Sequence, residues 1–200
     1  MHAKRSVAAI LAAFLAATAP CGLARASDKL HDKLTQIADA ELTKITGECS
    51  AYTRGEEQRY FFSHTLEGNS LPSVYLLVGV ACDYAAYNAS YRWFTIDTYG
   101  DLRNLAFAQP DIAVDYADDE DTEVKSMKIR GYYATLLVSN SDFDLEKLEI
   151  AATHKWRGIG DVSHTAIWRF INGDFLLQSF DVDATYDGKI NPRPLIRLPQ

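Results

Sequence analysis

The sequence predicts a mainly β fold: an antiparallel sandwich or open barrel of short strands, with one N-terminal amphipathic helix packed alongside. From residue 48 onward, short runs rich in aromatic and β-branched residues recur, and clusters of Gly, Asn, Asp and Ser separate them. Spacings of roughly eight to twelve residues between such runs are typical of all-β domains. Before residue 48, the apolar residues instead follow a helical period.

The first 26 residues have the features of a secretory signal peptide. Lys4 and Arg5 precede the apolar run 7–17, which is shorter than the about 20 residues of a membrane span. Ala24-Arg25-Ala26 then supplies the small-x-small pattern of signal cleavage. We therefore expect cleavage near Ala26 and a periplasmic or secreted protein without a membrane span, an uncleaved anchor being the alternative.

Residues 28–46 are the clearest helix of the chain, and the predicted division is signal 1–26, helix 27–47 and β-rich domain 48–200. One apolar stripe recurs at helical steps and comprises Leu30, Leu34, Ile37, Leu42 and Ile45. Ser27 or Asp28 can cap the start of the helix, and Gly47 can end it. We expect the stripe to pack on a sheet, although it could instead dock on a partner.

Strands are expected at the β-like runs that follow. These runs are 59–65, 73–80, 90–97, 102–107 (halted by Pro110), 132–139 and 148–156. Asn172-Gly173 between apolar alternations is the strongest hairpin signal, because a type I′ turn needs positive φ at both central residues. A second turn is expected at Asp187-Gly188, and the proline-containing segment 191–194 leads into an edge strand or tail.

The charge of the chain excludes several classes of partner. The 20 basic and 27 acidic residues give a net charge of −7, and removal of residues 1–26 takes away three basic residues and no acidic ones. The processed chain would carry about −10, which disfavours binding to phosphate backbones and to anionic membrane surfaces. The remaining partner class is an unknown protein or envelope component.

Cys49 and Cys82 form an even pair once Cys21 has left with the signal peptide. Disulfides persist in exported proteins, and a bridge closing a loop of this length would contribute roughly 3–4 kcal/mol. The pair therefore predicts a disulfide, and two separate buried thiols are the alternative.

Two acidic stretches invite comparison with calcium sites. The run from Asp115 to Glu123 holds six acids, but it lacks the glycine that turns a chain around an ion. The glycine of 181–188 stands too late for a calcium-binding loop, so a hairpin is the better interpretation. We expect a solvated loop, a hairpin and no metal site.

His154 and His164 flank Asp161, and a His/Asp pair can do acid–base chemistry or bind zinc. No third and fourth zinc ligands stand at a recognisable spacing. Gly158-Ile159-Gly160 lacks the third glycine of a nucleotide loop and predicts a tight turn, which Arg157 and Asp161 would straddle as an ion pair. The chain has no serine-nucleophile elbow and no recognisable cofactor motif.

Three segments then carry a family resemblance in sequence order: Cys82–Ser90 (CDYAAYNAS), Trp156–Asp161 (WRGIGD) and Ala166–Phe170 (AIWRF). Over about residues 80–180 the chain resembles an exported bacterial family catalogued as domain of unknown function 1176. That family has a cysteine after the Gly-Asp turn, where this chain has Val162. If that cysteine partners the one matching Cys82, Cys49 is the substitute here. The resemblance implies an exported β-rich domain and implies no activity.

Three functional hypotheses follow. The first is a non-enzymatic binding or inhibitory module of the periplasm, whose binding residues would be Tyr87, Asn88, Arg157, Asp161 and His164. The second is a small hydrolase in which His154 or His164 acts as base and Asp161 orients it. The third is a structural envelope protein that docks through its N-terminal helix.

Overall fold

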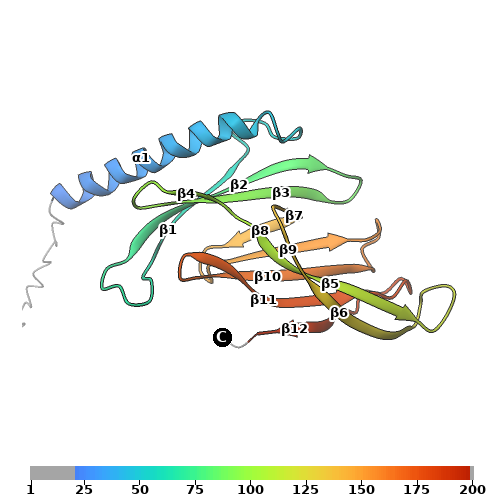
Figure 1. Ribbon diagram of the computed structural model, residues 1–200. Coiled ribbons are helices and arrows are strands. Elements are labelled where there is room, and N and C mark those ends of the chain that lie inside the picture. The colour runs from blue at the N-terminus through green and yellow to red at the C-terminus, as the bar shows by residue number, and fades with distance from the viewer. Residues whose placement is uncertain (1–20, 199–200) are drawn as a thin grey trace, which may run out of the picture.

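The structure is a computed structural model that describes residues 21–198, and it has three layers (Figure 1). A helix lies across the outer face of one five-stranded sheet, and a second five-stranded sheet packs against the inner face. A two-stranded hairpin lies beside the first sheet and covers the rest of the second one. The predicted antiparallel sandwich with one helix is confirmed, and the described residues form no closed barrel.

The elements in chain order are α1 (Cys21–Ile45), β1 (Gln58–His64), β2 (Ser73–Tyr84), β3 (Ala89–Asp97), β4 (Leu102–Asn104), β5 (Phe107–Tyr116), β6 (Val124–Thr135), β7 (Leu137–Ser139), β8 (Ser141–Asp144), β9 (Glu149–Lys155), β10 (Ser163–Ile171), β11 (Asp174–Asp183) and β12 (Arg193–Arg197). The upper sheet has the order β1-β2-β3-β4, with β7 paired to the far end of β3. The lower sheet has the order β12-β11-β10-β9-β8, and β5 pairs with β6 alone.

Helix α1 buries its predicted stripe against the upper sheet. Leu34, Leu42 and Ile45 are fully buried against alternate residues of β2 and β3, including Leu76 and Phe94. Successive side chains of β2 point to opposite faces of the sheet. The strand therefore contributes residues both to the core under the helix and to the core between the two sheets. The helical stripe and its packing on a sheet are confirmed.

A disulfide joins Cys49, just after α1, to Cys82 near the end of β2. The predicted pairing is therefore confirmed, and both cysteines belong to the core between helix and sheet. The bridge fixes the end of the helix to the sheet that the helix covers.

The main core lies between the two sheets and is rich in aromatic rings. Phe62 and Tyr75 of the upper sheet meet Phe170 of β10 edge to face, with ring centroids 5.0 and 4.8 Å apart. Phe170, Trp168 and Ala166 alternate with outward residues along β10 and are all buried, as the sequence predicts. The turn after β10 has φ of 50° at Asn172 and 94° at Gly173, which confirms the predicted hairpin.

The β5–β6 hairpin differs from the prediction. The sequence predicts one short strand, 102–107, ended by Pro110, whereas the chain forms β4, turns, and starts the long β5, in which Pro110 pairs with Tyr132. This prediction is wrong because β5 has one hydrogen-bonded neighbour. A proline is tolerated in such a strand, since its missing N–H can face the unpaired side.

The tip of this hairpin is held against the end of β11. The Tyr116 hydroxyl donates to the carbonyl of Ala184, and the backbone N–H of Tyr186 donates to the carbonyl of Asp121. The predicted edge strand near the C-terminus is present as β12, which pairs with β11 after a connection that contains Gly188. The hairpin and the upper sheet thus each cover a part of the lower sheet.

The N-terminal predictions fall largely outside the described part of the chain. Residues 1–20, most of the expected signal peptide, lie outside it. Helix α1 begins at Cys21 and passes through the expected cleavage point after Ala26, so Ser27 does not cap it in the uncleaved chain. Alanine, leucine and arginine in 23–26 are strong helix formers, which explains the earlier start. No helix in residues 21–198 has the length and apolarity needed to cross a membrane.

Candidate functional site

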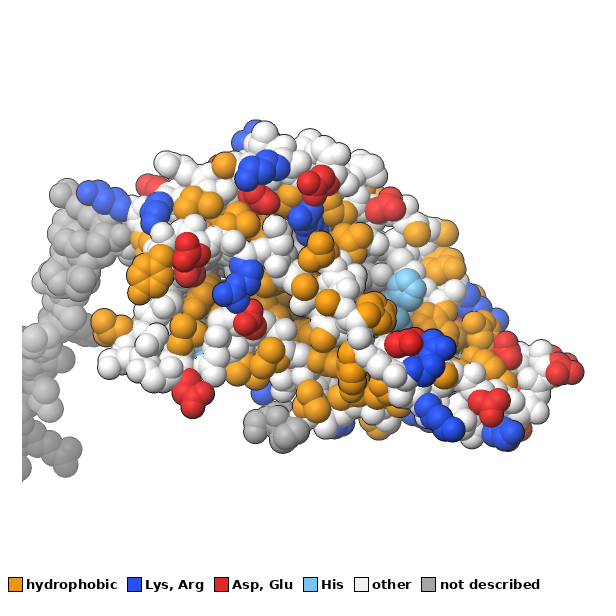
Figure 2. Space-filling view, in the orientation of Figure 1, with side chains coloured by type: hydrophobic (Ala, Val, Ile, Leu, Met, Phe, Trp, Pro, Cys, Tyr) orange, Lys and Arg blue, Asp and Glu red, His pale blue; other side chains and the backbone are white. Residues whose placement is uncertain are grey.

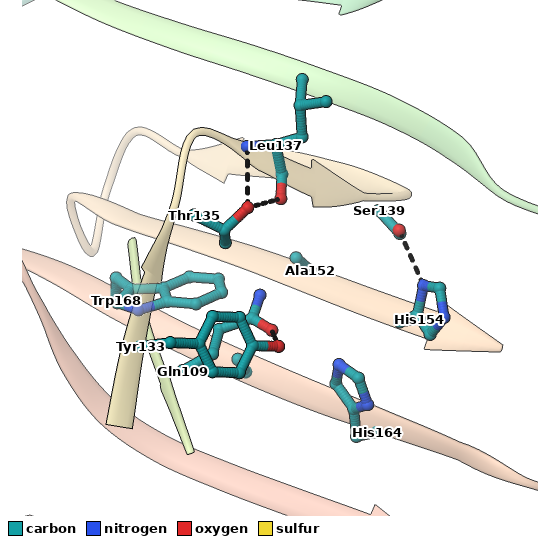
Figure 3. Close-up of a pocket in the computed structure, with 10 residues that line it drawn as sticks. Gln109, Tyr133, Thr135, Leu137, Ser139, Ala152, His154, His164 and Trp168 are labelled. Carbon is teal, nitrogen blue, oxygen red and sulfur yellow. Dashed lines mark hydrogen bonds between the residues drawn. The ribbon is translucent and has the colours of Figure 1, made fainter. Parts of the chain in front are cut away.

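A cavity of about 210 Å³ lies where the hairpin, the upper sheet and the lower sheet meet (Figure 3). Its walls come from five strands and comprise Gln109 of β5, Tyr133 and Thr135 of β6, Leu137 and Ser139 of β7, Ala152 and His154 of β9, and His164, Ala166 and Trp168 of β10. Figure 2 shows a histidine side chain, in pale blue, in a hollow bordered by hydrophobic side chains. The cavity is therefore an opening into the sandwich.

The register of β9 and β10 explains why space is left here. Ala152 faces Ala166 and His154 faces His164 across the two strands, all on the inner face. The next pair on that face inward is Ile150 with Trp168, both fully buried. Two alanines in a row of large core residues leave the volume that becomes the cavity, and two polar rings lie at its outer end.

His164 is held as a neutral imidazole. The indole Nε1 of Trp156 donates to its Nδ1 at 3.0 Å, and an indole N–H is only a donor. Nδ1 must therefore be unprotonated, so the hydrogen of the neutral ring sits on Nε2. Burial, together with a smaller effect of the nearby His154, lowers the pKa of His164 to about 4.

His154 lies beside His164 and contacts a serine. The two imidazole rings stack with centroids 5.3 Å apart, and the Nδ1 of His154 is 2.9 Å from the Oγ of Ser139 (Figure 3). Burial lowers the pKa of His154 as well. Both rings are thus uncharged near neutral pH and offer hydrogen bonds without a charge.

On the hairpin side of the cavity, the Tyr133 hydroxyl donates to the Oε1 of Gln109 at 2.9 Å. This bond fixes the amide, whose Nε2 points into the cavity (Figure 3). Tyr133 itself is half exposed. Its ring forms part of the cavity wall and reaches solvent.

Tyr87 and Asn88, predicted as binding residues, lie next to this site and join the two sheets. Asn88 is buried, and its side chain bonds the backbone of Lys155 at the end of β9. Its Nδ2 donates to the Lys155 carbonyl and its Oδ1 accepts from the Lys155 N–H, the two bonds that a neighbouring strand would otherwise make. The Tyr87 hydroxyl donates to the carbonyl of Trp156 at 3.2 Å. Neither residue lines the cavity.

Arg157 and Asp161 form the expected ion pair across the glycine turn. The Nε of Arg157 donates to Asp161 at 2.7 Å, a second bond joins Nη2 to Oδ2, and the N–H of Gly188 donates to the same carboxylate at 3.0 Å. The guanidinium beside it lowers the pKa of Asp161 to about 2. Gly160 has φ of 76°, as a tight turn requires.

Among the predicted residues, the structure brings His154 and His164 together at the cavity and leaves Asp161 apart from them. Both carboxylate oxygens of Asp161 are bound to Arg157 or Gly188, and in residues 21–198 neither histidine ring is hydrogen-bonded to a carboxylate. The turn acts on the site indirectly, because it positions Trp156, which in turn fixes His164.

A comparison with protein-family models matches residues 3–185 to the family described as "Protein of unknown function (DUF1176)". The chain belongs to the DUF1176 family. The match is wider than the segment 80–180 that carries the resemblance in sequence, and it includes α1 and the first strands. No curated protein and no solved structure matches this DUF1176 chain.

Of the ten residues that line the cavity of the DUF1176 chain, sequence reasoning singled out only His154 and His164 as candidate site residues. Gln109 lies on β5, which the sequence does not predict. The single strand expected over 132–139 is divided between β6, which carries Tyr133 and Thr135, and β7, which carries Leu137 and Ser139. One signal was present: Ala152-x-His154 and His164-x-Ala166 are mirror-image alternations, which meet if the strands pair about the 158–160 turn.

The acidic run has a local role in the DUF1176 chain. The Asp118 carboxylate accepts from the N–H groups of Thr122 and Glu123, at 2.9 and 3.0 Å, and so closes the turn between β5 and β6. Within residues 21–198, no three His, Cys, Asp or Glu side chains are grouped so as to hold a metal ion.

Proposed function

We propose that this protein is a non-enzymatic, exported binding module that takes a small ligand, or one end of a larger envelope component, into the cavity. The observation that carries the proposal is the convergence of neutral hydrogen-bonding side chains from three sheets on one opening. Binding sites in proteins are typically concave, with a few placed polar groups. The protein would reach the periplasm or the cell exterior through a signal peptide cleaved near Ala26.

The volume of the site favours a small ligand. Drug-sized molecules occupy pockets of about 300–1,000 Å³, and this cavity of about 210 Å³ lies below that range. A ligand of roughly one ring fits, whereas a longer molecule would leave most of its length outside.

A cavity-filling variant tests the binding role. Ala152→Leu adds three carbon atoms at a buried wall position, while Ala151→Leu adds the same atoms at the exposed neighbouring position of β9. We expect a screen of chemically diverse small molecules to find compounds that raise the melting temperature of the wild type and of Ala151→Leu but not of Ala152→Leu. The proposal fails if every stabilising compound also stabilises Ala152→Leu.

The hydrolase hypothesis has one observation in its favour, the 2.9 Å contact between the Ser139 hydroxyl and His154. A serine beside a histidine is the first half of a nucleophile–base arrangement. Asp161 cannot complete it while its oxygens are bound to Arg157 and Gly188. A hydrolase would therefore use Ser139, His154 and His164, without an orienting carboxylate.

This alternative is tested with chromogenic ester and amide substrates. Hydrolysis by the wild type that falls at least about 100-fold in both Ser139→Ala and His154→Gln would establish the hydrolase. Equal rates in wild type and variants would assign any turnover to a contaminant.

The third hypothesis, docking through the helix, would have to use the outer face of α1, because the apolar stripe is buried on the upper sheet. That outer face carries charged residues such as Lys29 and Asp32, both exposed. The cavity therefore remains the better-supported binding site.

A further inference from the structure

The cavity wall contains no charged side chain. Its ten residues include neither Lys, Arg, Asp nor Glu, although these four types make up 24% of the chain. The histidines do not supply the missing charge, because the Trp156 indole keeps His164 in its neutral form. The polar groups that a ligand meets here are therefore uncharged hydrogen-bonding groups.

Three side-chain nitrogen atoms of the wall have no partner in the described part of the chain. These are the Nε2 atoms of Gln109, His154 and His164, and each retains accessible surface. Two of the three are fixed donors: the amide nitrogen of Gln109, whose oxygen accepts from Tyr133, and Nε2 of His164. Polar groups inside proteins favour hydrogen bonds, so these three accessible nitrogens can pair with water or with a ligand.

The third nitrogen, on His154, is adaptable. A serine hydroxyl can donate or accept, so the Ser139–His154 contact allows Nε2 of His154 to be a donor or an acceptor. A sugar hydroxyl also donates and accepts. The ring of Tyr133 provides an apolar face at the opening, where the C–H face of a sugar ring can pack.

We propose that the cavity binds one uncharged sugar ring, whose hydroxyl or carbonyl oxygens accept from Gln109 and His164 while a further hydroxyl pairs with His154. This inference rests on the proposed binding function and names its ligand class. A ring of this kind fits the volume of about 210 Å³, and it carries several oxygens that can pair with the polar groups of the wall.

Two separate effects, the loss of hydration and the net charge of the protein, disfavour the binding of charged ligands. A carboxylate or ammonium group loses its hydration on entry and gains no opposite charge from the wall, which is costly. The net charge of −7 further repels anions over the whole surface. A cation lacks a fixed acceptor among the three partnerless nitrogens.

The test compares matched sugars on the full chain. Glucose and N-acetylglucosamine are neutral, glucosamine adds an ammonium group, and glucuronate adds a carboxylate to the same ring. We expect titrations followed by the side-chain NMR signals of Gln109, His154 and His164 to show binding of at least one neutral sugar. The charged analogues should bind at least about tenfold more weakly.

Two glutamines that each accept a hydrogen bond from a tyrosine hydroxyl supply a variant and its control. Gln109→Leu removes the donor in the cavity, whereas Gln58→Leu removes an amide that also accepts from a tyrosine hydroxyl, Tyr60, but on β1. We expect Gln109→Leu to weaken the binding of the neutral sugar at least about tenfold and Gln58→Leu to leave it unchanged. His154→Phe serves as a second cavity variant if Gln109→Leu fails to fold.

Two results would overturn the sugar assignment. One is equal or tighter binding of glucosamine or glucuronate, and the other is the absence of binding by all four sugars. In either case a different compound that stabilises the wild type but not Ala152→Leu would leave the binding function standing. If no compound passes that comparison, the binding function itself fails.

Discussion

Gly79 of β2 lies directly under the indole ring of Trp93 and leaves no room for a side chain. It faces Trp93 across β2 and β3, and a Cβ atom at Gly79 would lie 2.6 Å from two atoms of that indole ring. Trp93 is fully buried and donates to Ser141 at 2.9 Å, so the ring cannot move aside freely. We expect Gly79→Ala to lower the free energy of unfolding by about 1–3 kcal/mol, measured by urea denaturation.

Gly131 provides the control for this substitution. It also lies in a strand, β6, but a Cβ there meets no atom within 4 Å, and its φ is not positive. Gly131→Ala should change the unfolding free energy by no more than about 0.5 kcal/mol. Equal effects at the two glycines would show that contact with Trp93 is not the cause.

His164 gives the protein a dependence of stability on pH. Its pKa is about 4 in the folded protein against 6.5 for an ordinary histidine, so the unfolded chain binds its proton more readily. The stabilisation is fully present above pH 6.5 and is lost as the pH falls toward 4. A shift of this size corresponds to about 3 kcal/mol, and denaturation curves recorded from pH 7 to pH 4 should show that loss.

Substitution separates this histidine from the other titrating groups. His164→Gln should remove most of the loss between pH 6.5 and 4, while His31→Gln, on α1, should leave it in place. Parallel pH profiles for wild type and His164→Gln would contradict the assignment. Asp161, whose pKa Arg157 lowers to about 2, contributes only below about pH 4.

Among the elements, α1 is attached to the upper sheet by its apolar stripe and by the Cys49–Cys82 disulfide. The bridge closes a loop with a sequence separation of 33, for which loop entropy gives roughly 3–4 kcal/mol of stabilisation. We expect the double variant Cys49→Ser, Cys82→Ser to lose about that much unfolding free energy. Wild type under reducing conditions should match the variant, and an unchanged free energy would show that packing alone attaches the helix.

Elements that follow from a local sequence pattern were predictable from the sequence. The stripe of α1 and the Asn172-Gly173 turn are local patterns, and both match the structure. The β5–β6 hairpin was not predictable in this way, because Pro110 and the acidic run 115–123 resemble strand breakers. Their effect depends on β5 having a single hydrogen-bonded neighbour, which is a property of the assembled sheets.

The candidate site was predictable only in part for the same reason. His154 and His164 are conspicuous in sequence, but the contribution of Ala152 and Ala166 is visible only once the strands are in register. Asp161 lies between the two histidines in the sequence, yet the turn directs its carboxylate to Arg157 and Gly188. Spacing in the sequence alone could not show whether Asp161 orients a histidine or closes the glycine turn.

At the scale of the whole molecule, the lower sheet is longer than the upper sheet can cover, and the hairpin covers the remainder. Aromatic side chains seal the contact with the upper sheet near Phe170, and Val124 and Met127 of the hairpin pack near Val182. The cavity lies at the seam between these two covers. Its wall therefore combines residues of the hairpin, of the upper sheet and of the lower sheet, which no single sheet could supply.

The route of the chain to its compartment gives the last prediction. If residues 1–26 are a signal peptide, the exported protein begins at Ser27 and has lost Cys21, so its two remaining cysteines are joined in the disulfide. The intact mass of protein from a bacterial periplasm should equal that of residues 27–200 less two hydrogens, with no free thiol. Lys4→Glu with Arg5→Glu should reduce this processing, because a signal needs a positively charged start. A periplasmic or membrane-bound product that retains residues 1–26 would instead support an uncleaved anchor.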